Sequence, residues 1–219
     1  MTSTDEVTAS NTAEWYFDII SPFAYLQLPA MLALNDRLAV KPTPILFGVI
    51  LQTLGQLGPA EIPRKREFTY RHVQWQAERV GVILRFPPTH PFNPITALRL
   101  IIAAGTSWDA VAAVFSHVWR DGLAGDSVDS LAAVGRTLGI DDVATATAGD
   151  GVKLALLGNT EAALRHGIFG VPTLRIGERL FWGNDATAMI HDWFANPGRF
   201  DAGEYARFAT LPASVTRQR

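Results

Sequence analysis

The chain has 219 residues, of which 48% are hydrophobic and 18% charged, a composition typical of one globular domain or of one domain with a large insertion. Its formal net charge is −2 and it has no long run of Lys or Arg, so we expect no nucleic-acid surface. It contains no cysteine, which excludes disulfides, thiolate metal sites and cysteine nucleophiles. A thiol used in any chemistry must therefore arrive with a ligand.

The first 13 residues are polar, rich in Thr and Ser, and lack a hydrophobic stretch. We therefore expect residues 1–13 to form a flexible tail rather than a signal peptide. No run of about 18 apolar residues follows, so no membrane span is expected. The protein is accordingly predicted to be cytoplasmic.

A strand, a helix and a second strand are predicted at the start of the folded part. The aromatic and β-branched residues 15–20 favour a buried strand, which ends at Ser21-Pro22. Because Ser is a favoured N-cap and Pro a favoured first helical residue, a helix is predicted from there to about Leu38, kinked or interrupted at Pro29. A strand is predicted over residues 40–47. Ser21 then lies at the strand edge where open α/β sheets bind ligands.

The middle of the chain predicts an all-helical block. Residues 48–63 are rich in Gly and Pro and are expected to form mostly loop. Helical patterns follow over residues 64–81, 94–104, 108–120, 129–138 and 151–166. After this block, residues 173–182 predict a β-hairpin with a two-residue turn. A last helix is predicted over about 186–195, with loop from Asn196 onward.

Three segments carry candidate chemistry, and each has a plain structural alternative. At a helix N-terminus, Ser21 could stabilise a thiolate, or it could serve only as a helix cap. Val171-Pro172 could form a cis bond that frees the Val171 backbone to pair with a peptide, or it could simply begin a strand. Trp182-Gly183-Asn184-Asp185 could bind the charged ends of an amino acid, or it could only begin a helix.

Together and in this order, these motifs resemble the 2-hydroxychromene-2-carboxylate isomerase family and the related kappa-class glutathione transferases. The matching stretches are YFDIISPFAYL (16–26), IPRK (62–65), FPPTHPFNP (86–94) and GIFGVPTLRIGERLFWGND (167–185). The similarity extends over nearly all of residues 14–195. It implies an α/β fold, a thioredoxin-like domain with a large all-helical insertion. The discontinuous domain would take residues 14–60 plus 167–219, and the insertion would take residues 61–166.

The resemblance also implies glutathione as the cofactor. Ser21 would contact and activate its sulfur, and the backbone of Val171, held beside Pro172, would pair with its cysteinyl part. Trp182, Gly183, Asn184 and Asp185 would hold the γ-glutamyl end. Within that segment, Asp185 would meet the ammonium group.

Further positions are assigned by the same resemblance. Lys65 would meet the glycyl carboxylate of glutathione, and Gln56 would lie in the same region. Phe23, His90 and Asn93 would contact the second substrate. No metal site is expected, because the five histidines lack ligand spacing and cysteine is absent.

One position departs from the family pattern. The isomerases carry an Asn-Arg pair soon after the Gly-Pro that matches Gly58-Pro59, whereas this chain has Glu61-Ile62. An arginine lost there removes a partner for a substrate carboxylate. Arg64, Lys65 or Arg71 could take its place.

The resemblance implies a glutathione-dependent isomerase that acts on a conjugated carbonyl compound in aromatic catabolism. Two alternatives stay open: a kappa-class-like glutathione transferase, in which glutathione remains on the product, and a non-enzymatic binding module with a thioredoxin fold. The expected partners are glutathione and a small-molecule substrate. Relatives suggest a homodimer.

Overall fold

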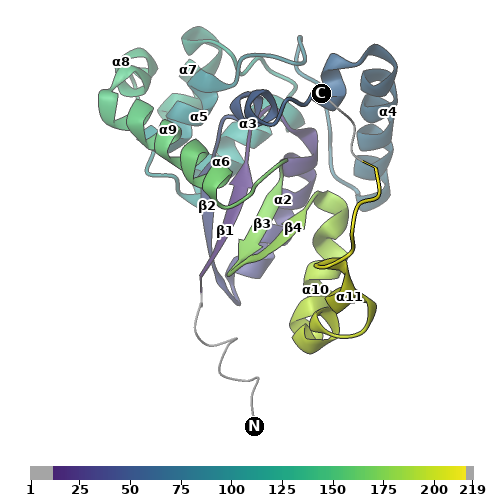
Figure 1. The fold of residues 1–219 in the computed structure, drawn as a ribbon. Helices are drawn as coiled ribbons and strands as arrows, with labels where there is room; N and C mark the ends of the chain where they lie inside the picture. Colours follow the sequence, from purple (N-terminus) through teal and green to yellow (C-terminus); the bar gives the residue numbers. More distant parts are fainter. Residues whose placement is uncertain (1–11, 216–219) are drawn as a thin grey trace.

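The structure is a computed structural model, and it describes residues 12–215. Its centre is a four-stranded mixed sheet with the strand order β2-β1-β3-β4 (Figure 1). β1 (Thr12–Phe17) pairs in parallel with β2 (Ala39–Pro44) and antiparallel with β3 (Thr173–Ile176). β3 pairs antiparallel with β4 (Arg179–Trp182), so the predicted hairpin is confirmed.

Helices make up most of the rest of the described chain. α2 (Pro22–Asn35) connects β1 to β2, and nine helical segments separate β2 from β3. They are α3 (Phe47–Thr53), η1 (Pro59–Glu61), α4 (Pro63–Val80), α5 (Ile95–Ala103), α6 (Trp108–Phe115), η2 (Ser116–Arg120), α7 (Val128–Thr137), α8 (Val143–Ala148) and α9 (Asp150–Arg165). After β4 come η3 (Asn184–Ala186), α10 (Thr187–Ala195), η4 (Pro197–Asp201) and α11 (Glu204–Phe208). Among residues 12–215, no helix is long and apolar enough to cross a membrane.

The side chains of β1 alternate between two apolar clusters, as the period of a strand requires. Trp15 and Phe17 are fully buried in the larger cluster, and their rings stack with centroids 4.7 Å apart. Tyr16 points to the other face and packs with Ile45 and Ile168. Burying each such side chain stabilises the fold by about 2 kcal/mol. β1 is therefore covered on both faces.

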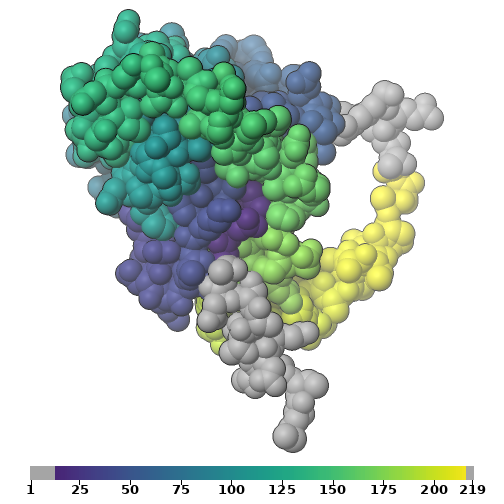
Figure 2. All heavy atoms as spheres, turned by 90° about the vertical axis from the view of Figure 1, so that its left-hand side faces the viewer, coloured from purple at the N-terminus to yellow at the C-terminus, as the bar shows by residue number. Residues whose placement is uncertain are grey.

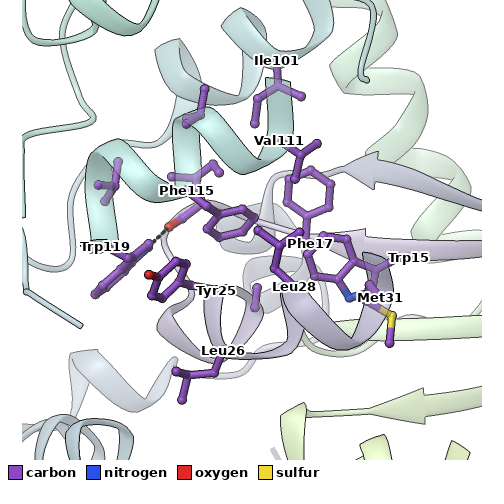
Figure 3. Packing of buried hydrophobic residues seen from close by; sticks show 14 of the residues in the cluster. Trp15, Phe17, Tyr25, Leu26, Leu28, Met31, Ile101, Val111, Phe115 and Trp119 are labelled. Atoms are coloured by element: carbon purple, nitrogen blue, oxygen red, sulfur yellow. Dashed lines mark hydrogen bonds between the residues drawn. The ribbon is translucent and has the colours of Figure 1, made fainter. Parts of the chain in front are cut away.

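The larger cluster joins the sheet to the helical block. Phe115 of α6 packs between Phe17 and Tyr25, with ring centroids 5.5 Å and 6.3 Å away (Figure 3). Leu98 of α5 and Val73 of α4 belong to the same buried cluster. The helical block thus shares one continuous core with the sheet, and its boundaries at residues 61 and 166 as a separate domain stay a prediction.

Two predicted boundaries near the N-terminus are wrong. The tail was expected to include residues 12 and 13, but these begin β1, where Ala13 is buried and pairs with Val40 and Ile176. The strand was expected to reach Ile20 but ends at Phe17, because the chain turns at Asp18. Residues 1–11 lie outside the described part of the chain.

The expected loop over residues 48–63 contains a helix, α3. The sequence offers no cap for it, since Leu46 at the N-cap position has no suitable side chain. The carboxylate of Asp18, 29 residues earlier, accepts the Phe47 N–H at 2.9 Å. The buried Ile50 anchors the helix to the smaller cluster. A contact distant in sequence therefore starts this helix.

Two other expectations need correction. Pro29 does not interrupt α2, which continues to Asn35 and so ends before Leu38. The segment after Asn196 was expected to be loop, but η4 and α11 form within it, supported by ring contacts of Tyr205 with Phe200 and Phe208. Residues 201–215 are exposed throughout, and Figure 2 shows the yellow end of the chain extending away from the body.

Close packing between α7 and α8 allows no side chain at Gly135. A β-carbon there would collide with Val143 and lie 3.0 Å from the Ile140 carbonyl oxygen, whereas one at Gly158 of α9 would meet nothing within 4 Å. We expect Gly135→Ala to destabilise the protein by about 1–3 kcal/mol through overpacking. Gly158→Ala should stabilise it by about 0.5–1 kcal/mol through helix propensity. Urea unfolding of both variants measures this, and equal shifts would contradict the packing.

Candidate active site

The residues between β1 and α2 form a closed turn around Ser21. The Ser21 N–H donates to the Asp18 carbonyl at 3.0 Å, and the Asp18 carboxylate accepts the Ile20 N–H at 3.0 Å. Ser21 is the N-cap of α2 and is 7% exposed, and its hydroxyl oxygen accepts the Ala24 N–H at 3.3 Å. The capping role is confirmed. It leaves the hydroxyl proton free, since Oγ donates to no described residue.

Two side chains from the helical block hold the backbone of this turn. The Trp119 indole N–H donates to the Ile19 carbonyl at 2.7 Å, the bond drawn as a dashed line in Figure 3. His90 Nε2 lies 2.8 Å from the Ile20 carbonyl oxygen. Because a carbonyl only accepts, Nε2 carries the proton. Nδ1 is then an acceptor in the neutral ring, and the Tyr70 hydroxyl lies 2.7 Å from it. The same hydroxyl donates to the His90 carbonyl oxygen at 2.8 Å.

Aromatic rings surround the His90 imidazole. The centroids of Tyr70, Phe86, Phe92 and Trp119 lie 5.2–6.2 Å from that of His90. Burial lowers the pKa of His90, which favours the neutral ring at pH 7. Both ring nitrogens already have protein partners. His90 thus has a positioning function beside Ser21, and its predicted contact with substrate stays a prediction.

Asp18 is a fully buried carboxyl group beneath the turn, and the sequence reasoning missed it by treating it as strand. Its two oxygens accept N–H groups of Ile20 and Phe47, joining the turn to α3. Burial raises the pKa of Asp18 to about 7, outweighing these two bonds, which lower it. The sequence around Asp18 does not show that its carboxyl group is buried, because Asp is mostly exposed in folded proteins and would be expected at the end of the strand.

The segment Val171-Pro172 lies beside the turn. Its peptide bond is cis, which answers the alternative left open by the sequence. The β1–β3 register pairs Tyr16 with Thr173, and its continuation sets Val171 opposite Asp18. Val171 is 8% exposed, yet its backbone N–H and carbonyl make no hydrogen bond with residues 12–215. An extended peptide could pair with these groups.

The segment 182–185 is joined to the same site. The Gly183 N–H donates to the Pro172 carbonyl at 2.8 Å, and the Gly183 carbonyl accepts from Gln27 of α2 at 2.9 Å. Asn184 donates to Gln76 of α4 at 3.4 Å. Trp182 is 55% exposed at the end of β4. The structure therefore links the turn, the cis bond and the predicted γ-glutamyl segment.

The remaining predicted residues lie on the surrounding elements, and none is bonded to the turn itself. Lys65 on α4, Gln56 after α3 and Asp185 in η3 are exposed, and within the described chain their side chains have no hydrogen-bond or ion-pair partner. Phe23 packs against His72, with ring centroids 6.2 Å apart. Asn93 accepts the N–H of Ile95, the first residue of α5, at 3.1 Å. Its contact with substrate stays a prediction.

The departure at Glu61-Ile62 has a local explanation. The Glu61 carboxylate accepts the Gly58 N–H and closes the η1 turn, while Ile62 is the N-cap of α4. Glu61 is therefore occupied in the turn. Any cation that serves a substrate carboxylate must come from another position.

The comparisons with known proteins agree with this architecture. The family model of the DSBA-like thioredoxin domain matches residues 12–195. A 2-hydroxychromene-2-carboxylate isomerase of Pseudomonas putida is 30% identical over 189 residues, covering 81% of this chain and 91% of that protein. A solved structure of a 2-hydroxychromene-2-carboxylate isomerase superposes with a TM-score of 0.73 at 25% identity, covering 92% of this chain and all of that one. Glutathione S-transferase kappa 2 of Caenorhabditis elegans is 22% identical over 206 residues, covering 84% of this chain and 92% of that protein.

The fold and the site thus define a thioredoxin-fold protein in which the turn before the first long helix carries serine, and the predicted fold class is confirmed. Within the DSBA-like thioredoxin proteins, the chain belongs to the 2-hydroxychromene-2-carboxylate isomerase family. The resemblance read from the four sequence stretches is confirmed at the level of family.

The buried Asp18 makes stability depend on pH. Its pKa of about 7 in the folded protein exceeds the ordinary value of 3.8, so between these values the folded state binds more protons than the unfolded state. The free energy of unfolding should therefore fall as pH rises from about 4 to 7, by up to about 1.4 kcal/mol per unit. Asp18→Asn removes this dependence. Urea unfolding of both proteins at several pH values measures it, and parallel pH profiles would be inconsistent with a raised pKa.

The bond from His90 to the turn predicts a specific loss of stability. His90→Phe keeps the ring among its aromatic neighbours but leaves the Ile20 carbonyl unpaired, which should cost about 1–3 kcal/mol in unfolding free energy. His72→Phe is the matched control, because His72 lies on α4 with no bond to the turn. Chemical denaturation compares the two variants. The assignment fails if His90→Phe is as stable as His72→Phe.

Proposed function

We propose that this chain is a glutathione-dependent isomerase of the 2-hydroxychromene-2-carboxylate type. The observation that carries the proposal is the free hydroxyl proton of Ser21 at the start of α2, beside the unpaired backbone of Val171. A hydrogen-bond donor at a helix N-terminus stabilises an anion such as a thiolate. The names of the relatives support the isomerase reaction.

The residues assigned around the turn offer a group for each part of glutathione. The Val171 backbone offers a donor and an acceptor to its cysteinyl part, as in strand addition. The unpartnered carboxylate of Asp185 suits the ammonium of its γ-glutamyl end, and the unpartnered Lys65 suits its glycyl carboxylate. Gln56, Trp182 and the 183–184 backbone are assigned supporting contacts.

Bound glutathione would supply a thiolate whose addition to a conjugated carbonyl compound makes the carbon–carbon double bond single, so that rotation can occur before loss of the thiolate restores the double bond and the free cofactor, with no net change of charge or oxidation state. The protein's part is to keep that sulfur ionised and fixed. Ser21 donates to it, the positive end of the α2 dipole favours its charge, and Val171 fixes its approach. Phe23 and Asn93 are assigned to the second substrate.

The related kappa-class transferase supports a second candidate reaction, in which glutathione stays on the product. Lys65 fits that class as well. A mass measurement on the product separates the two, because only a transferase product retains glutathione. The same proposal includes a cytoplasmic location, a homodimeric state and a role in aromatic catabolism.

Two serines that cap helices allow the role of Ser21 to be tested against capping alone. Ser107 caps α6 through a bond from Ala110 N–H at 3.2 Å, as Ser21 caps α2. Ser21→Ala and Ser107→Ala should each lose about 1 kcal/mol of stability. Only Ser21→Ala should raise the pKa of the thiol of bound glutathione, by about 1–2 units, through loss of a hydrogen bond to a charged group.

Titration calorimetry gives glutathione binding, and thiolate absorbance against pH gives the pKa. Absence of glutathione binding to the unmodified protein would sink the proposal. An unchanged thiol pKa in Ser21→Ala would leave Ser21 with capping alone. Binding without turnover of 2-hydroxychromene-2-carboxylate would favour a binding module instead.

A further inference from the structure

Four cationic side chains, those of Arg64, Lys65, Arg66 and Arg71, lie in the first half of α4, and they differ in burial. Arg64 and Arg71 are exposed, with 97% and 79% of their side chains accessible, and both approach Glu67, at 4.0 Å and 2.9 Å. Lys65 is exposed as well. Arg66 is partly buried, and within residues 12–215 its side chain has no hydrogen-bond or ion-pair partner. A cation in such a position favours a ligand that brings the counter-charge.

Arg66 lies on the face of α4 that packs inward. Helical spacing sets it on one side with Tyr70, Val73 and Ala77, and the last two are fully buried. Arg64 and Arg71 lie on the outward side with Glu67. Of these cations, Arg66 is thus the one whose helix face turns to the core.

A short series of contacts connects Arg66 to the turn that holds Ser21. Tyr70 is one helical turn after Arg66, where side chains are neighbours. Its hydroxyl contacts His90 Nδ1 at 2.7 Å, and His90 Nε2 contacts the Ile20 carbonyl at 2.8 Å, next to Ser21. Burial raises the pKa of Tyr70 and lowers the pKa of His90. The charge of Arg66 acts on both groups as a smaller effect that lowers each pKa.

We propose that Arg66 binds the carboxylate of the second substrate and holds an aryl carboxylate between α4 and the Ser21 turn. The rings of Tyr70, Phe86 and His90 supply an apolar surface for the aryl group, with Tyr70 and Phe86 only 4.6 Å apart by centroid. Arg66 takes the role left open by Glu61-Ile62. This inference rests on the proposed function for the identity of the substrate.

Direct binding tests the inference without turnover. The probes are chromone-2-carboxylate, which cannot isomerise, and the neutral chromone-2-carboxamide, each titrated by tryptophan fluorescence with and without glutathione. The unmodified protein should bind the carboxylate about 10–100-fold more tightly than the carboxamide, as one charged hydrogen-bonded pair provides. Arg66→Gln should remove that preference and leave carboxamide binding within about twofold.

Matched variants on the same helix keep the test specific. Arg79→Gln removes an exposed cation that stacks on Trp75, and it should retain the preference, as should Arg64→Gln. The inference is overturned if the unmodified protein binds neither probe or binds both equally, if Arg66→Gln keeps the preference, or if Arg64→Gln loses it. Failure of glutathione binding in calorimetry is a separate outcome that concerns the proposed function alone.

Discussion

The candidate site depends on how the backbone of one four-residue turn, Asp18 to Ser21, is held. The Asp18 carbonyl is bonded to the Ser21 N–H, and the Ile20 N–H to the Asp18 carboxylate. The Ile19 and Ile20 carbonyls are bonded to Trp119 and His90. Each of these backbone groups has a fixed partner, so the direction of the Ser21 side chain is set before any ligand arrives. Such preorganisation makes a single hydroxyl effective, because no reorientation is needed on binding.

The hydrogen-bond partners of this turn come from distant parts of the chain, so the position of the turn depends on the helical block. Trp119 is 100 residues from Ile19, and His90 is 70 residues from Ile20. The shared core of Phe17, Tyr25 and Phe115 keeps those partners in place. Local opening of α6 together with η2, which carries Trp119, would therefore release the Ile19 carbonyl as well as expose apolar surface. The helical block therefore both packs against the sheet and holds the backbone of the turn.

Local signals explain what the sequence could predict. The cap at Ser21, the two-residue hairpin turn and the helical periodicities depend on neighbours in the chain, and all three appear in the structure. The α3 helix could not be predicted, because its first N–H is accepted by Asp18 from 29 residues away. The early start of β1 follows likewise from pairing partners at Val40 and Ile176.

The same distinction governs the site. The family pattern predicts residues for ligand contact, and these are Ser21, Val171 and the 182–185 segment. It did not bring out Asp18, Tyr70 or Trp119, because their partners are backbone atoms or a ring whose positions only the fold determines. Residues that position others leave little trace in a motif, since their chemistry is a hydrogen bond rather than a reaction.

The two readings of Ser21, as a helix cap and as a thiolate donor, are compatible in this geometry. A hydroxyl has two lone pairs and one proton, and capping uses a lone pair to accept the Ala24 N–H. That bond fixes the oxygen and leaves the hydroxyl proton available to a ligand. A thiolate in front of α2 would therefore meet a donor whose oxygen the cap already holds in place. A cysteine at this position would bring its own sulfur to the helix N-terminus, whereas serine leaves room there for the sulfur of a ligand.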